Sequence, residues 1–136
     1  MGVVFGTYSL TVMPVGQDFS DFNFTTSFSG NSTPEVLEGS FELEGERQFL
    51  KCSVRLSSLS IVSRSQESLS ELVFDLNTRL GSHTNTNVDG TLKIDNMMKL
   101  DCYEYNNTHF VIQYTRLFHG SEEAHYKIEV TFNAAN

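Results

Sequence analysis

The sequence contains no tryptophan, only two prolines and only two cysteines among its 136 residues. So few prolines exclude collagen-like and proline-rich chains. Charged residues make up 19% of the chain, which is too few for a coiled coil or for a charged disordered protein. Long apolar runs are also missing, since no stretch approaches the roughly 20 residues of a membrane-spanning helix. These absences favour an ordinary globular domain.

Basic residues are scarce as well: 9 Lys and Arg stand against 17 Asp and Glu, which gives a net charge of -8 and a pI near 4.8. An acidic surface repels phosphate, so we expect neither nucleic acid nor an anionic membrane as a partner unless cations intervene. Residues 1–10 lack the basic and apolar regions of a signal peptide. We therefore expect a soluble protein without membrane insertion. A virion or an extracellular assembly is compatible with this, but the sequence leaves the location unknown.

The two cysteines, Cys52 and Cys102, are separated far beyond the spacing of a zinc knuckle or a CxxC redox motif. Both share the phase of apolar neighbours, Cys52 with Leu50 and Cys102 with Leu100. Small thiols at such positions are typically buried. We expect two buried free cysteines, and a disulfide between facing strands is the alternative.

The chain length corresponds to one domain, and we assign residues 1–136 to a single all-β domain. Apolar residues recur at every second position, which is the pattern of strands that bury one face. The pattern predicts strands over 3–13, 22–29, 37–44, 50–57, 72–80, 88–94, 98–105, 109–118 and 124–132. About eight or nine such strands, joined by short turns, predict an antiparallel jelly-roll-like β-sandwich or a closed β-barrel.

Three segments interrupt this alternation. The phase slips at Ser57 and Ser58, which predicts a β-bulge or a strand that changes sheets. Residues 63–80 fit both a helical and a strand period, and we favour a helical turn near residues 65–72 followed by a strand. Residues 81–87 are polar throughout and predict a flexible loop. A hairpin over residues 37–57 should pair Glu42 or Glu44 with Lys51.

No catalytic signature is present, and the polar residues fall on outward strand phases or in turns. We therefore expect a protein that is not an enzyme and that needs no cofactor. We expect no metal site. Four residues in one predicted turn region are the best metal candidates, but a solvated turn is the favoured explanation for them. These are His119, Glu122, Glu123 and His125. Asp18 and Asp21, with Glu35 or Glu38, form a calcium candidate, for which a solvated acidic face is again the favoured explanation.

Two functions from different classes fit these features. The first is a non-catalytic structural protein, a β-sandwich building block or decoration protein of a larger assembly, whose partner is another protein or a further copy of itself. The second is a small barrel or lectin-like module for an apolar ligand or a glycan, with aromatic cavity walls and polar loop residues. The ligand-binding candidates are Phe24, Phe28, Tyr114, His83, Asn85 and Asn87.

Overall fold

The computed structural model describes residues 2–16, 22–87, 89–90 and 93–134. The regular secondary structure of these described residues consists of β-strands alone. The ten strands are β1 (Gly2–Pro14), β2 (Phe22–Ser32), β3 (Val36–Leu43), β4 (Glu46–Val54), β5 (Ser58–Arg64), β6 (Ser68–Asp75), β7 (Leu80–Asn87), β8 (Lys93–Tyr105), β9 (His109–Phe118) and β10 (Ser121–Ala134). Each strand pairs antiparallel with its neighbours in sequence, and β10 pairs with β1. The sheet therefore closes on itself as an up-and-down barrel.

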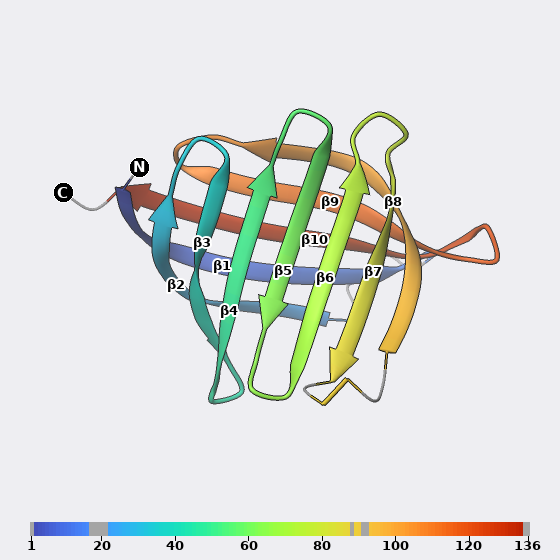
Figure 1. Cartoon of the computed structure of the whole chain (residues 1–136), viewed down its shortest axis with the longest axis horizontal. Helices are drawn as coiled ribbons and strands as arrows, with labels where there is room; N and C mark the ends of the chain where they lie inside the picture. The colour runs from blue at the N-terminus through green and yellow to red at the C-terminus, as the bar shows by residue number, and fades with distance from the viewer. Residues whose placement is uncertain (1, 17–21, 88, 91–92, 135–136) are drawn as a thin grey trace.

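The barrel is flattened into two layers (Figure 1). Strands β3 to β7 run steeply in front of β1, β9 and β10, which lie close to horizontal in this view. The longest strands, β1, β8 and β10, have 13 or 14 residues. A bulge between Leu100 and Cys102 interrupts the pairing of β8 with β9, and bulges are where a strand bends most easily. The layers therefore enclose one interior between crossed sheets.

The all-β prediction is confirmed, and of its two alternatives the structure has the closed barrel. The strand count of eight or nine was too low, and the predicted helical turn near residues 65–72 is wrong. The Ser65 hydroxyl accepts hydrogen bonds from the backbone N–H groups of Glu67 and Ser68, each at 3.2 Å. This serine turn imitates the first turn of a helix locally. The chain then enters β6 because Leu72 and Phe74 alternate into the interior.

The flexible loop predicted over residues 81–87 is also wrong, because this segment is most of β7. Residues 95–97, which separate the strands predicted over 88–94 and 98–105, also lie inside β8. The pairing of β7 with both β6 and β8 fixes the strand without help from apolar residues. Its inward positions carry Gly81, His83 and Asn85 instead, so the sequence lacks the usual alternation. Of the strand predicted over 88–94, residues 88, 91 and 92 lie outside the described residues.

Turn chemistry sets the register of the β3–β4 hairpin. Glu44 and Gly45 have φ values of 54° and 80°, which is the left-handed conformation that a two-residue hairpin turn requires. This turn places Glu38 opposite Lys51 and Glu42 opposite Arg47. The predicted pairing of Glu42 or Glu44 with Lys51 is therefore wrong, because the turn at Glu44 and Gly45 sets a different register.

The phase slip at Ser57 and Ser58 also comes from a turn. It follows the end of β4 and precedes β5, and Leu56 at its tip is fully exposed. A turn resets the inward phase because its residues belong to neither strand. Cys52 and Leu50 before the turn and Leu59 and Ile61 after it all point inward. The expected bulge or change of sheet is therefore replaced by an ordinary hairpin connection.

Two inward-facing glycines allow strands to approach closely where the barrel wall bends. A Cβ atom on Gly6 would overlap the carbonyl oxygen of Thr131 and lie 2.7 Å from Cα of Phe132. A Cβ atom on Gly39 would lie 2.6 Å from Cζ of Phe28. Glycine within a strand commonly marks such a bend or a site of close backbone approach. Barrel closure therefore depends on positions that carry no side chain at all.

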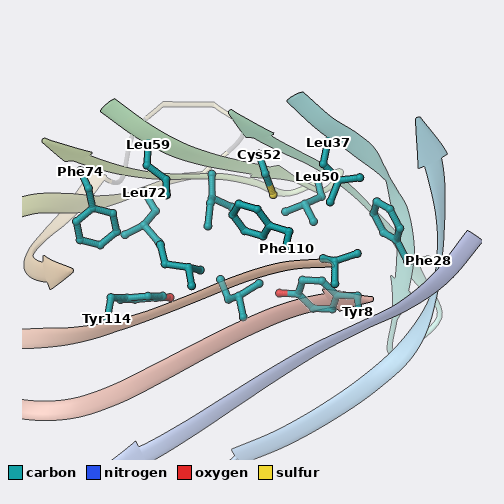
Figure 2. Close-up of a cluster of buried hydrophobic side chains, with 14 of the residues drawn as sticks. Tyr8, Phe28, Leu37, Leu50, Cys52, Leu59, Leu72, Phe74, Phe110 and Tyr114 are labelled. Atoms are coloured by element: carbon teal, nitrogen blue, oxygen red, sulfur yellow. The ribbon is translucent and has the colours of Figure 1, made fainter. Parts of the chain in front are cut away.

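The apolar core fills the half of the barrel that holds the start of β1, the end of β10 and the β2–β3 and β8–β9 turns. Figure 2 shows its side chains converging from both layers. Leu37, Leu59, Phe74 and Phe110 are completely buried there. Phe110 packs edge-on against Tyr105, with ring centroids 5.8 Å apart. The large aromatic residues that the sequence supplies at every second position therefore act as the core of this half.

The two cysteines have different environments. Cys52 is buried, as predicted, whereas Cys102 is exposed, and both are free. The bulge after Leu100 shifts the phase of β8 by one residue, which turns Cys102 outward instead of inward. The expectation of two buried thiols is therefore wrong for Cys102, and no disulfide links the pair.

We expect one thiol per chain to react with Ellman's reagent in the native protein. Exposure makes Cys102 accessible, whereas burial both covers Cys52 and raises the pKa of its thiol. Cys102→Ser should abolish the fast reaction, and Cys52→Ser should leave it unchanged. Unfolding in urea should release the second thiol. Two fast thiols in the native wild-type protein would contradict the assignment.

Candidate functional site

The other half of the barrel, where β3 turns into β4, is not filled. A cavity of about 240 Å³ lies between the two layers here. Most of its wall is aromatic or aliphatic: Tyr8, Leu10, Phe22, Phe24, Phe41, Leu43, Leu50, Ile61, Leu72, Tyr114, Tyr126 and Ile128. Four polar residues complete the wall, namely Gln48, Ser63, Ser70 and His83. We call this space the barrel cavity.

The polar residues of the barrel cavity come from four consecutive strands, β4 to β7. Ser63 and Ser70 face each other across β5 and β6. The Ser70 hydroxyl and Nε2 of His83 are hydrogen-bonded at 2.6 Å. Polar groups on inward phases would destabilise a packed core unless each were hydrogen-bonded. Their concentration on one wall therefore marks a surface that faces a space and not a core.

The register extends this polar wall beyond the cavity lining. Asn85 lies opposite Ser70, and Asn96 of β8 lies opposite His83. Residues directly opposite each other in antiparallel strands share one face of the sheet. Both asparagines therefore belong to the inward face of the polar wall, towards the β3–β4 end of the barrel.

Stacked aromatic pairs form the facing wall. Tyr8 stacks on Phe41 with ring centroids 4.0 Å apart, and Tyr114 stacks on Tyr126 at 5.0 Å. In Figure 2 the hydroxyl groups of Tyr8 and Tyr114 both point toward the middle of the interior. Burial raises the pKa of each hydroxyl well above its ordinary value. Both tyrosines therefore remain neutral hydrogen-bond donors.

His83 is held in its neutral form. Burial lowers the pKa of its ring, and the positive charge of Arg116 lowers it further. At neutral pH the wall of the barrel cavity therefore carries no formal charge, because none of its other residues is an acid, a lysine or an arginine. Such a wall suits the apolar part of a ligand together with a few hydrogen-bonding groups.

The structure brings together three of the six predicted ligand-binding residues. Phe24, Tyr114 and His83 all line the barrel cavity. Phe28 instead packs at the filled end, where it is 2% exposed. Asn85 and Asn87 lie on β7 opposite Ser70 and Ser68. Phe24, Tyr114 and His83 therefore share one cavity, and their role in binding a ligand stays a prediction.

The four metal candidates are dispersed around the β9–β10 turn. Glu122 accepts a hydrogen bond from Lys99 at 2.6 Å and lies 3.9 Å from His125. Glu123 is paired with Arg116, and His119 packs edge-on against the ring of Phe118. Within the described residues no group of three or more His, Cys, Asp or Glu side chains is arranged to hold a metal ion.

The described residues of the calcium candidate are also separated from one another. Glu35 forms an ion pair with Arg55 at 3.6 Å, and Glu38 lies opposite Lys51. Asp18 and Asp21 lie outside the described residues. Glu35 and Glu38 therefore each lie beside a basic residue and do not face each other.

Sequence reasoning missed Arg116, which stands next to the barrel cavity. It follows Ile112 and Tyr114 at even spacing on β9 and so shares their inward phase. Its guanidinium lies over the ring of Tyr126, 5.9 Å from the centroid, and is paired with Glu123. A cation on the inward phase of a strand breaks the apolar pattern, and this break is visible in the sequence.

Comparison with known proteins adds little to this description. No protein-family model matches the sequence, and no curated protein matches it either. Among solved structures, the ywiB protein from Bacillus subtilis aligns over 99% of this chain and 93% of that chain, with a TM-score of 0.43 and 7% identity. A likeness this low carries no argument about function. In the part of the chain that the structure describes, no helix is long and apolar enough to cross a membrane.

Proposed function

We propose that this protein is a non-catalytic binding protein that holds a small, largely apolar ligand in the barrel cavity. The observation that carries the proposal is the inward polar wall of β4 to β7, which faces an unfilled space. Local sequence rules are broken most often where a protein has a functional reason to break them. Here the break and the cavity coincide.

The size of the cavity limits the ligand. An apolar cavity of about 150 Å³ accommodates benzene, which has six carbon atoms. In proportion, a cavity of about 240 Å³ accommodates a ligand of roughly ten non-hydrogen atoms. At a modest ligand efficiency of about 0.3 kcal/mol per atom, such a ligand binds with a dissociation constant in the millimolar range or below.

Binding is favoured over catalysis by the state of the Ser70–His83 pair. A serine beside a histidine has the composition of a nucleophile and its general base. A general base works best when its pKa lies near the working pH. Burial moves the pKa of His83 downward and away from neutrality, which weakens it as a base. The hydrogen bond is therefore better suited to orienting a ligand group.

We expect 1-octanol to bind saturably to the wild-type protein and Phe24→Ala to weaken that binding about tenfold. Removing the ring deletes apolar contact with the ligand that is worth roughly 1.4 kcal/mol. The measurement is a titration followed by NMR chemical shifts. Phe118→Ala is the matched control, because Phe118 is exposed at the end of β9 and lies outside the cavity. Absence of saturable binding, or equal weakening by both variants, would contradict the proposal.

A structural role in a larger assembly is our second proposal. An assembling β-protein can pair an exposed edge strand with another chain. The ten described strands offer no such edge, because the sheet is closed. What favours assembly is the outer surface, where Phe5 and Phe49 are about half exposed. Native mass spectrometry tests it: a defined oligomer that Phe5→Ser or Phe49→Ser disrupts supports assembly, and a wild-type monomer contradicts it.

A further inference from the structure

Arg116 lies on the inward phase of β9, opposite the buried residues Met98 and Ala124, and stands beside the barrel cavity. Its guanidinium, the ring of Tyr126 and the ring of Tyr114 form a continuous stack, in which centroid distances are 5.9 Å and 5.0 Å. Both tyrosines line the cavity. The positive charge of Arg116 also acts on His83, which lines the opposite wall. Arg116 therefore stands within electrostatic reach of any group bound between these walls.

The hydrogen-bonding capacity of Arg116 is only partly used. A guanidinium carries five N–H donors in a planar fork that matches a carboxylate. The Nη2 group is paired with Glu123, but Nε is buried and has no hydrogen-bond partner among the described residues. A buried unpaired donor on a charged group is costly, and such exceptions in a native structure call for a physical explanation.

We infer that the ligand of the barrel cavity is an amphipathic carboxylic acid, whose apolar part contacts the aromatic wall and whose carboxylate is held by Arg116. This inference rests on the proposed function. Arg116 does not line the cavity and its Nε is enclosed by protein, so its side chain would move toward Tyr126 to offer Nε–H to a carboxylate oxygen. The neighbouring polar wall offers His83 and Ser70 as further hydrogen-bonding groups. The roughly ten non-hydrogen atoms that the cavity accommodates correspond to a medium-chain acid.

The acidic surface of the protein does not oppose this binding. Exposed charges more than about 8 Å from the ligand are largely screened at physiological salt concentration. Among the described residues, the carboxylate that is paired with the guanidinium and so competes directly is that of Glu123. Removing the charge of Glu123 should therefore strengthen the binding of an anionic ligand, whereas removing the charge of Arg116 should weaken it.

The test compares octanoate with 1-octanol, two probes that differ in the charged group, by NMR titration at neutral pH. We expect wild-type protein to bind octanoate at least about tenfold more tightly than octanol, as a charge-assisted hydrogen bond predicts. Arg116→Gln should reduce octanoate affinity at least about tenfold and leave octanol affinity within about twofold. Glu123→Gln should increase octanoate affinity. Lys127→Gln, which removes a cation of β10 that pairs with Glu129, is the control and should change neither.

Each outcome decides between the two claims. If octanol binds at least as tightly as octanoate to the wild type, or if Arg116→Gln leaves octanoate binding unchanged, the carboxylate inference is overturned while the cavity proposal stands. If neither probe binds, the proposed function itself fails. If Arg116→Gln does not fold, as judged by circular dichroism, Glu123→Gln decides: unchanged or weaker octanoate binding overturns the inference.

Discussion

Gly6→Ala is expected to lower the free energy of unfolding by at least about 3 kcal/mol, the upper end of the usual cost of overpacking. Gly6 lies on the inward phase of β1 between two phenylalanines, Phe28 of β2 and Phe132 of β10. An added Cβ would overlap the backbone carbonyl of Thr131. Backbone atoms cannot move aside as a flexible side chain does, so β1 and β10 must separate where they close the barrel.

Gly2→Ala is the matched control for this substitution. Gly2 lies on the same strand, and a Cβ there would meet nothing within 4 Å. Surface changes of this kind usually alter stability by less than about 0.5 kcal/mol. Urea unfolding followed by circular dichroism measures both variants. If Gly6→Ala were as stable as Gly2→Ala, the close approach of β1 and β10 would not contribute to stability in solution.

Phe110→Ala should destabilise the protein by about 3 to 5 kcal/mol, the usual range for deleting a buried phenyl ring. Phe110 is 0% exposed, packs edge-on against Tyr105 and lies opposite Val130 of β10. Deleting the ring removes apolar burial and leaves a void at the filled end of the barrel. The surrounding strands are hydrogen-bonded on both sides and can relax only partly, so the cost belongs to the upper part of the range.

Phe118→Ala serves as the comparison, because the same chemical change is made where the ring is 61% exposed. We expect a loss of less than about 0.5 kcal/mol there. Urea denaturation midpoints with unchanged slopes give both values. A small loss for Phe110→Ala would mean that the filled end of the barrel is loosely packed. It would also remove the contrast between a filled end and an end that holds a cavity.

The ligand-binding candidates illustrate how far the sequence reaches. Phe24 and Phe28 have the same chemistry and the same phase, yet Phe24 lines the cavity and Phe28 packs in the core. The difference depends on which end of the barrel each residue reaches, and this follows from closure of the sheet. His83 was identified for the wrong reason, as part of a loop, because a strand with a polar inner face has no apolar alternation to reveal it.

The sequence alone determined the all-β class and the positions of most strands, because alternating apolar residues can be buried together only on one face of a sheet. It also placed the buried rings of Phe28, Tyr114 and Phe132 on inward phases. Only the tertiary structure decided barrel over sandwich, the exposure of Cys102 and the proximity of Arg116 to His83. These depend on pairing β1 with β10, on one bulge in β8 and on contacts between distant strands, and no local pattern encodes them.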